Sequence, residues 1–402
     1  MNMNDGHGNA RRGVRLKAAA FVYPWDVNGD PDAPARIAGL GVEQVTLAAA
    51  YHSTRALTPR HPRHRVVTAE HAAVLYPPGD HWTGRIPRPY PAGPWAPGDA
   101  HGEAARALAG AGLAVHTWVV LAHNSRLGAE HPDTSVRNAY GDRYPWAPCI
   151  AQQATRAYLT DLAAEAAVRP GARGTELESL GWYGLPHLHA HDKISGVPLG
   201  EAGEYLMSLC FCPACRTGYG EQGLDAGELA SAVRAALEPL WRGAAADRGL
   251  PMVAELLGEE RAAAVRAWRG GVARGLQEEA VAAVRAAAPA GFQVLLHADP
   301  VPEHCGANAG VDPAHILSVA DGVVVPCTAG TAPLAPFAAH AGERTVLAAN
   351  FTVVSGMGGS PRTLAADAAR ARTAGATELR LYHAGLASDG DLAAVREALA
   401  TR

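Results

Sequence analysis

The stretch LCFCPACR, residues 209–216, places three cysteines within six positions of a chain that has six cysteines in all. Closely spaced thiols are typical of metal ligands in a reducing compartment, where disulfides are rare. A tetrahedral structural zinc needs four ligands, and the fourth candidate lies in the loop after the preceding expected strand. We predict one structural Zn²⁺, with an iron–sulfur cluster or free thiols as the alternatives. The predicted zinc ligands are Cys149, Cys210, Cys212 and Cys215.

Two carboxylates in TELESLGWY, residues 175–183, have a spacing suited to acid–base chemistry. Glu176 and Glu178 are two residues apart, so on a strand they share a face, about 6.6 Å apart along the backbone. A carboxyl pair at such a separation can serve as acid and base, or as acid and nucleophile, on a glycosidic bond. We predict a direct acid/base role for Glu178. Glu176 either binds substrate or pairs with an arginine or lysine deeper in the fold.

Polar and aromatic side chains stand at the ends of most other expected strands. The further catalytic candidates are Asp26, His297 and Asp299. The candidates for substrate binding are Trp25, His52, His123, Asn124, Glu176, Trp182, His187, His189, Asn350, Tyr382 and His383. The two tryptophans suit stacking on a sugar ring, and they equally suit packing.

The loop LPHLHAHDK, residues 185–193, carries histidines at alternate positions. In an extended loop His187, His189 and His191 face one side. This pattern is compatible with a substrate-binding rim, with a second metal site that includes Asp or Glu, or with a solvated loop.

Eight short β-rich runs alternate with alanine-rich helical stretches, and these elements must position the candidates above. Many helices end in a glycine just before the next strand, which is a common helix C-cap. Eight βα units predict an α/β fold, a (β/α)8 TIM barrel whose strands all end at one mouth. The alternative, a doubly wound open sheet, would have a G-x-G-x-x-G turn where this chain has YPWDVNGD. The expected strands are 14–23, 43–51, 114–122, 175–183, 292–298, 321–327, 344–351 and 378–384, and the expected helices are 33–40, 101–112, 152–168, 224–288, 312–319, 332–341, 361–374 and 390–401.

We expect one barrel domain over residues 13–402, preceded by a flexible N-terminus at 1–12. Residues 53–100 follow the second strand, contain nine prolines, and form either a lid or an ordered excursion with its aromatics packed beneath it. Residues 184–290 run from the histidine-rich loop through the cysteines into a helical insertion. That insertion could cover one side of the barrel or mediate dimerisation, so a homodimer is one expected assembly.

The composition limits the classes of partner. The chain has 402 residues, 48% of them hydrophobic, and a formal net charge of −4. This is enough apolar material for a large core, and there is no basic field to attract nucleic acid or an anionic membrane. Because no run of about 18 apolar residues occurs, we expect no membrane-spanning helix. We expect a cytoplasmic protein, since the apolar stretch after Arg11–Arg12 is too short for a signal peptide.

The motif CFCPAC, with a lone cysteine in the preceding βα loop, resembles the zinc cluster of the β-galactosidases of glycoside hydrolase family 42. The resemblance implies a (β/α)8 barrel in which zinc holds loops beside the active site. It also implies the acid/base role for Glu178, because the acid/base glutamate of that family ends strand 4 shortly before the cysteines.

The sequence departs from that family at two places. Leu177 stands where the family has Asn, and no carboxylate occurs between Arg344 and Ser360, where the family has its nucleophile. The retaining mechanism is therefore not carried over. A second carboxylate from Asp299 or Asp26 would favour an inverting arrangement.

Three functions are compatible with these patterns. The first is a glycoside hydrolase that acts on a small-molecule carbohydrate through Glu178. The second is a metal-dependent sugar isomerase, epimerase or lyase, which would use Glu178, His297 and Asp299 as ligands together with the histidine-rich loop. The third is a non-catalytic sugar-binding barrel, which the missing carboxylate of strand 7 would explain.

Overall fold

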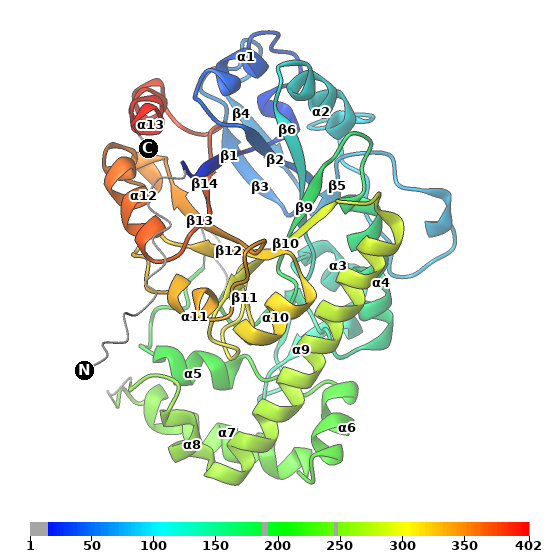
Figure 1. Cartoon of the computed structure of the whole chain (residues 1–402). Helices are drawn as coiled ribbons and strands as arrows, with labels where there is room; N and C mark the ends of the chain where they lie inside the picture. The colour runs from blue at the N-terminus through cyan, green and yellow to red at the C-terminus, as the bar shows by residue number, and fades with distance from the viewer. Residues whose placement is uncertain (1–14, 187–191, 245–247, 402) are drawn as a thin grey trace, which may run out of the picture.

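Eight parallel strands close into a barrel in the computed structural model, which describes residues 15–186, 192–244 and 248–401 (Figure 1). Each strand pairs with the next one along the chain, and the last pairs with the first. The predicted (β/α)8 barrel is therefore confirmed, and the alternative of an open sheet is excluded. Its strands are β1 (Lys17–Val22), β2 (Gln44–Tyr51), β6 (Ala114–Val120), β9 (Gly174–Glu178), β10 (Gln293–Asp299), β12 (Gly322–Pro326), β13 (Val346–Thr352) and β14 (Glu378–Tyr382).

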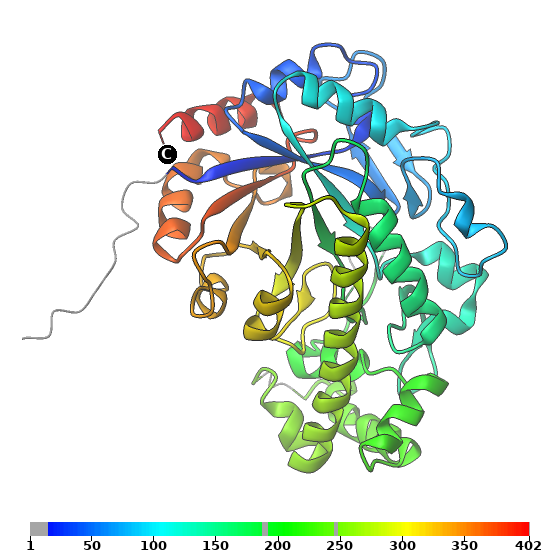
Figure 2. The same ribbon diagram turned by 45° about the vertical axis from the view of Figure 1, so that its right-hand side comes forward.

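Helices cover the outside of the barrel, and α4 and α9 pack along each other on one side (Figure 2). The covering helices are α1 (Ala33–Ala38), α2 (Ala100–Gly110), α4 (Gln153–Ala167), α9 (Glu259–Ala287), α10 (Pro313–Val319), α11 (Leu334–Ala338), α12 (Leu364–Thr373) and α13 (Asp389–Ala400). Within the described residues, none of the helices has the length and apolar character needed to cross a membrane.

The strands are buried on both faces, as expected for a barrel inside a ring of helices. In β1, Ala18, Ala20 and Val22 belong to the core between strands and helices, whereas Phe21 belongs to a separate cluster with Trp118. Successive side chains of a strand point to opposite faces. This alternation decides which side chains enter the barrel.

Strand β9 ends at Glu178, five residues earlier than the sequence predicted. The next residue, Ser179, has a φ of 56°, a left-handed conformation that cannot continue a strand. The chain therefore turns directly after Glu178 and leaves its side chain at the last position of the strand.

Part of the segment 53–100 packs against α4. Tyr76 and Trp82 both direct polar atoms to Glu165 of α4, with the Trp82 Nε1 donating to Oε2 over 2.7 Å. At its start, β3 (Thr54–Leu57) and β4 (Val66–Ala69) form a hairpin, and β5 (Ala73–Val74) adds antiparallel to β2. The segment thus includes both packed aromatics and a projecting hairpin.

The insertion after β9 contains several separate helices, and two breaks divide the helical segment expected over 224–288. Gly243 and Gly258 have φ values of 83° and 84°, which end one helix and separate the next two. Figure 1 shows these helices grouped at one end of the molecule, against the end of α9. They are α5 (Gly200–Met207), α6 (Pro213–Glu221), α7 (Ala226–Trp241) and α8 (Met252–Leu257).

Four further elements belong to the loops. A loop after β6 contains α3 (Ser125–Glu130) and the pair β7 (Ser135–Arg137) and β8 (Arg143–Pro148), and β11 (Ala309–Gly310) pairs with β10.

Candidate active site

A cavity of about 1030 Å³ lies over the C-terminal ends of the barrel strands. This is the end at which (β/α)8 enzymes place their catalytic residues. Its innermost lining consists of buried or half-buried side chains from six strands or strand ends. These are Tyr23, Tyr51, Trp118, Glu178, His297 and Tyr382.

Glu178 lines this cavity with 8% of its surface exposed. The Trp118 indole Nε1 donates a hydrogen bond of 2.7 Å to its Oε2, and the His297 Nδ1 lies 3.9 Å from the same oxygen. One carboxylate oxygen is thus held by a rigid donor. The carboxyl group is positioned by the barrel wall and does not depend on a loop.

Glu176 lies deeper and does not line the cavity. It is fully buried, and its Oε1 accepts hydrogen bonds from the Arg380 Nε at 2.6 Å and from the Thr46 hydroxyl at 3.0 Å. Burial by itself would raise the pKa of Glu176, but Arg380 and the nearby His297 lower it to about 2. Of the two roles considered from sequence, the structure therefore places Glu176 in the pairing role.

Arg380 pairs with two buried carboxylates of the barrel interior, because it also donates to Glu378 Oε2 at 2.8 Å. We expect Arg380→Met to destabilise the protein by about 3–5 kcal/mol at pH 7, since it leaves Glu176 buried without its cation. The pKa of Glu176 is lowered on folding, so its stabilising contribution is present above about pH 4.5 and is lost as the pH falls towards 2. Urea unfolding at pH 7 and at pH 3 measures this, and the difference between wild type and variant should be smaller at pH 3.

The double variant Arg380→Met/Glu176→Gln is the control for Arg380→Met. It removes both charges and should recover part of the lost stability at pH 7. Equal destabilisation by the single and the double variant would show that the arginine contributes through packing alone.

Three tyrosines surround the inner end of the cavity. The Tyr23 and Tyr51 hydroxyls are 3.0 Å apart, and Tyr382 lines the same space. Burial raises the pKa of Tyr23, Tyr51 and Tyr382 above the ordinary value. At neutral pH they are neutral hydroxyls, able to donate and accept hydrogen bonds with a sugar.

A row of rings forms one wall of the cavity. The His52 ring stacks on Tyr51 with centroids 4.2 Å apart, and His123 lies between His52 and Tyr183, at 4.9 Å and 4.6 Å from them. All four rings line the cavity, as does Asn350. The structure thus brings His52, His123, Asn350 and Tyr382 together with Glu178 and His297.

Three predicted site residues at the ends of β1 and β14 lie outside this cavity. Trp25 and His383 are buried, and each stacks on Tyr23. Asp26 accepts a hydrogen bond from the Tyr23 backbone N–H at 2.8 Å. Burial raises the pKa of Asp26 to about 7 and lowers that of His383 to about 3.

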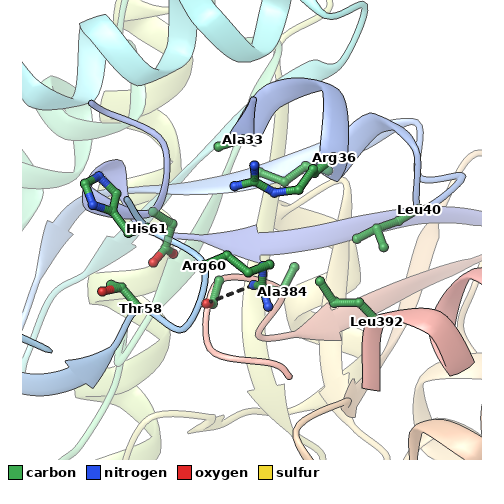
Figure 3. A pocket seen from close by; sticks show the side chains of 11 residues that line it. Ala33, Arg36, Leu40, Thr58, Arg60, His61, Ala384 and Leu392 are labelled. Atoms are coloured by element: carbon green, nitrogen blue, oxygen red, sulfur yellow. Dashed lines mark hydrogen bonds between the residues drawn. The ribbon is translucent and has the colours of Figure 1, made fainter. Parts of the chain in front are cut away.

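Asp26 instead lines a separate cavity of about 30 Å³ between α1 and α13. Figure 3 shows Arg60 reaching across this space to the Ala384 carbonyl, with Arg36 and His61 around it. Arg60 also donates to the carbonyls of Gly385 and Ala387. These hydrogen bonds of Arg60, at the edge of the small cavity, connect the segment 53–100 to the chain that follows β14.

Three other predicted residues also lie outside the main cavity. Asp299 lines an adjoining cleft of about 330 Å³ and lies 3.0 Å from the His304 Nδ1. Asn124 caps α3 by accepting from the Leu127 N–H. Trp182 donates to the Arg269 carbonyl. His187 and His189 lie outside the described residues.

Several lining residues were not among the sequence candidates, and Trp118 and Glu204 are two of them. Trp118 lies inside β6, two residues from His116 and from Val120. These three residues share one face of the strand, and that pattern could have marked Trp118 as facing the barrel interior. Glu204 of α5 lines the cavity, and among the described residues it and Glu178 supply the carboxylates there. Its position depends on how the insertion folds, which no local pattern indicates.

Four buried cysteines form a candidate metal site beside this region. Their sulfur atoms lie within 4.8 Å of one another, and the Cys149 Sγ is 3.6 Å from those of Cys212 and Cys215. Four sulfurs in a tetrahedron around zinc would be about 3.8 Å apart, given a Zn–S bond of about 2.3 Å. Backbone N–H groups of Arg137 and Cys212 each lie 3.5 Å from the Cys210 Sγ. The set therefore fits a tetrahedral thiolate site.

No protein-family model matches the chain, and no curated protein matches its sequence. Solved structures do match its fold, and several are glycoside hydrolases. α-L-Fucosidase isoenzyme 2 from Paenibacillus thiaminolyticus has a TM-score of 0.57 at 12% identity over 96% of this chain and 49% of its own. The PgaB (BpsB) glycoside hydrolase domain from Bordetella bronchiseptica has a TM-score of 0.53 at 15% identity over 96% and 99%.

A cold-adapted β-galactosidase from Rahnella sp. R3 has a TM-score of 0.55 at 10% identity over 97% of this chain and 56% of its own. The present chain thus spans about half the length of the fucosidase and of this β-galactosidase. At these identities the likeness establishes the barrel architecture that these glycoside hydrolases share.

Proposed function

We propose that this protein is a glycoside hydrolase and that Glu178 is its general acid. The observation that carries the proposal is the position of Glu178, fixed by the Trp118 indole at the inner end of a large cavity over the barrel mouth. The surrounding tyrosine hydroxyls and imidazoles supply hydrogen bonds for a sugar. Glu178 would donate its proton to the oxygen of the leaving group.

The second catalytic group in this proposal is Glu204. Asp26 and Asp299, which the sequence suggested for this role, line other cavities, whereas Glu204 lines the same cavity as Glu178. A carboxylate that activates water across the cavity would give inversion at the anomeric carbon. His297 lies close to both Glu176 and Glu178 and would assist by orienting the acid.

The metal in this proposal is a structural zinc held by the four cysteines. Four thiolates fill the coordination of zinc, so the ion would stabilise loops and take no part in the reaction. The isomerase hypothesis has less support, because Asp299 lines a different cavity from Glu178 and His297. Within the described residues, groups of at least three potential metal-ligating atoms gather only at the cysteines.

The proposed function is tested with 4-nitrophenyl glycosides of galactose, glucose, fucose and N-acetylglucosamine. We expect hydrolysis of at least one of them, and proton NMR of the first-formed product should show the inverted anomer. Glu204→Gln should lower the rate roughly 10²-fold or more, as expected for loss of a general base.

Glu201→Gln is the matched control for Glu204→Gln, because both residues are on α5 and line the adjoining cleft, but Glu204 also lines the main cavity and Glu201 does not. It should leave the rate nearly unchanged. Retention of configuration, or equal effects of the two substitutions, would rule out Glu204 as the base. Failure to hydrolyse any of the four glycosides would favour the sugar-binding alternative.

A further inference from the structure

Exposed apolar side chains gather at the outer edge of the cavity. The described residues include seven large hydrophobic side chains with high exposure, and three of the seven line this one cavity. They are Leu57, Met357 and Ile194, with exposed fractions of 63%, 51% and 48%. Val66, which is 50% exposed, is paired with Leu57 across the hairpin of β3 and β4. Together we call Leu57, Met357 and Ile194 the apolar rim.

The apolar rim is assembled from separate parts of the chain. Leu57 ends β3, Met357 ends the short 3-10 helix Ser355–Met357 after β13, and Ile194 lies between β9 and α5. Each residue is exposed, so a polar side chain would suit its position equally well for folding. Exposed apolar side chains that line a cavity can mark a binding site, and these three line the cavity that also contains Glu178.

The cavity changes character with depth. The inner residues are hydrogen-bonding and almost fully buried, since Tyr51, Glu178 and His297 have exposed fractions of 5%, 8% and 4%. The exposed residues of the lining include the three aliphatic side chains of the apolar rim, together with the polar side chains of Arg55, Glu204 and Thr328. A ligand that matches both ends is polar where it lies against Glu178 and apolar where it leaves the cavity.

The volume agrees with a ligand larger than one sugar. The cavity measures about 1030 Å³, at the upper end of the roughly 300–1,000 Å³ typical of sites for drug-sized ligands. Polar groups also occur near the rim, namely Arg55 and the Thr328 and Thr352 hydroxyls, which lie 3.2 Å apart. Arg55 is exposed on the hairpin and can stay hydrated while its neighbour Leu57 is covered.

We propose that the substrate is a glycoside with an apolar aglycone, an alkyl or aryl group that lies against Leu57, Met357 and Ile194 while the sugar lies against Glu178. The inference rests on the proposed function for the identity of the inner group as a sugar. Burial of the aglycone would select this substrate over an oligosaccharide, whose next unit would place hydroxyls against aliphatic side chains.

The test compares methyl and octyl glycosides of galactose, glucose and fucose, below the micelle concentration of the octyl compounds. Binding is measured by titration calorimetry on the Glu178→Gln protein, in which turnover should be slow enough not to disturb the titration. We expect an octyl glycoside to bind roughly tenfold or more tightly than the methyl glycoside of the same sugar, given the apolar area it would cover. Leu57→Ser/Met357→Ser should reduce that preference roughly tenfold and leave methyl glycoside binding unchanged.

Ile86→Ser is the matched control, since Ile86 is 73% exposed in the same insertion but does not line the cavity. It should not alter the preference. Equal binding of methyl and octyl glycosides, equal weakening of both by the rim substitutions, or no binding of any octyl glycoside would each overturn the proposal. So would a dimer, seen by sedimentation, that the rim substitutions dissociate without any change in aglycone preference.

The two proposals fail in different ways. If wild-type protein hydrolyses methyl and octyl glycosides equally well, the aglycone inference is wrong and the hydrolase function stands. If octyl glycosides bind preferentially but Glu178→Gln hydrolyses glycosides as fast as wild type, the hydrolase mechanism is wrong and the apolar rim remains a binding site.

Discussion

Glu178→Gln should lower the rate of glycoside hydrolysis roughly 10²–10⁴-fold, the range expected for loss of a general acid. The amide has the shape of the carboxyl group, and its oxygen can still accept the hydrogen bond from the Trp118 indole. The fold and the ground-state binding of a sugar should therefore be kept. What is lost is the proton that the leaving oxygen needs.

The dependence on the leaving group identifies this loss as the loss of an acid. A nitrophenolate is a good leaving group and departs without much protonation, whereas an alkoxide is a poor leaving group and needs a proton to depart. We therefore expect Glu178→Gln to reduce kcat far more for an octyl or methyl glycoside than for the 4-nitrophenyl glycoside of the same sugar. A uniform reduction for all leaving groups would assign Glu178 to sugar binding, and an unchanged rate would contradict the mechanism.

Trp118→Phe is the companion variant, because it removes the indole N–H that holds the Glu178 Oε2 and keeps an aromatic ring in its place. It should keep the acid and loosen its position, so a smaller loss of kcat is expected, again larger for the poor leaving groups. Melting temperatures of both variants should be measured, since Trp118 is almost fully buried and its replacement also costs packing.

The barrel could be predicted from the sequence because its signals are local. Each strand is a short apolar run, and a glycine such as Gly41, Gly112 or Gly375 follows the preceding helix with a positive φ, as such a C-cap requires. Eight repeats of this pattern leave few alternatives. The boundaries were less certain, as β9 shows, since the left-handed conformation of Ser179 depends on contacts that the sequence pattern does not reveal.

The strand-end candidates show where such reasoning stops. Position at the end of a barrel strand places a residue at the correct face, but the first turn of the following loop decides where its side chain points. Asp299 accepts a hydrogen bond from the Val301 N–H, and Asp26 accepts one from the Tyr23 N–H. Each carboxylate caps its own turn and so faces away from Glu178.

The cysteines were predictable for a different reason. Three of the four cysteines lie within six residues of sequence. The fourth, Cys149, is in the preceding βα loop, which the barrel topology places next to theirs. Glu204 had no comparable signal, because its approach to the cavity depends on the packing of the whole insertion, including the contact of the Tyr144 hydroxyl with the Met207 carbonyl at 2.8 Å.

Cys212→Ser should remove the proposed zinc and destabilise the insertion. We expect metal analysis of the wild-type protein to give about one zinc per chain, and of the variant to give far less. Binding of zinc to four thiolates contributes on the order of 10 kcal/mol to holding such loops folded. A fall in melting temperature of roughly 5–10 °C is therefore expected even if only part of that energy couples to global unfolding.

Cys327→Ser is the matched control, because Cys327 is a buried thiol outside the cluster. It measures the cost of exchanging a buried sulfur for oxygen and should leave the zinc content unchanged. Visible absorbance with bound iron would favour an iron–sulfur cluster, and no bound metal in wild-type protein would leave the four thiols as a packing cluster.

The consequence for the active site follows from chain connectivity. Cys149 directly follows β8, and the Phe211 N–H donates to the Arg137 carbonyl, so the cluster joins the loop after β6 to the start of α6. Glu204 is on α5, six residues before Cys210, and α5 is tied to the same loop after β6 through the Tyr144 hydroxyl, which donates to the Met207 carbonyl. Loss of zinc should therefore reduce hydrolysis by displacing Glu204, while Glu178, held within the barrel by Trp118, keeps its place. If zinc only stabilises the insertion, the zinc-free protein should still bind a methyl glycoside, and the main change should be a lower kcat.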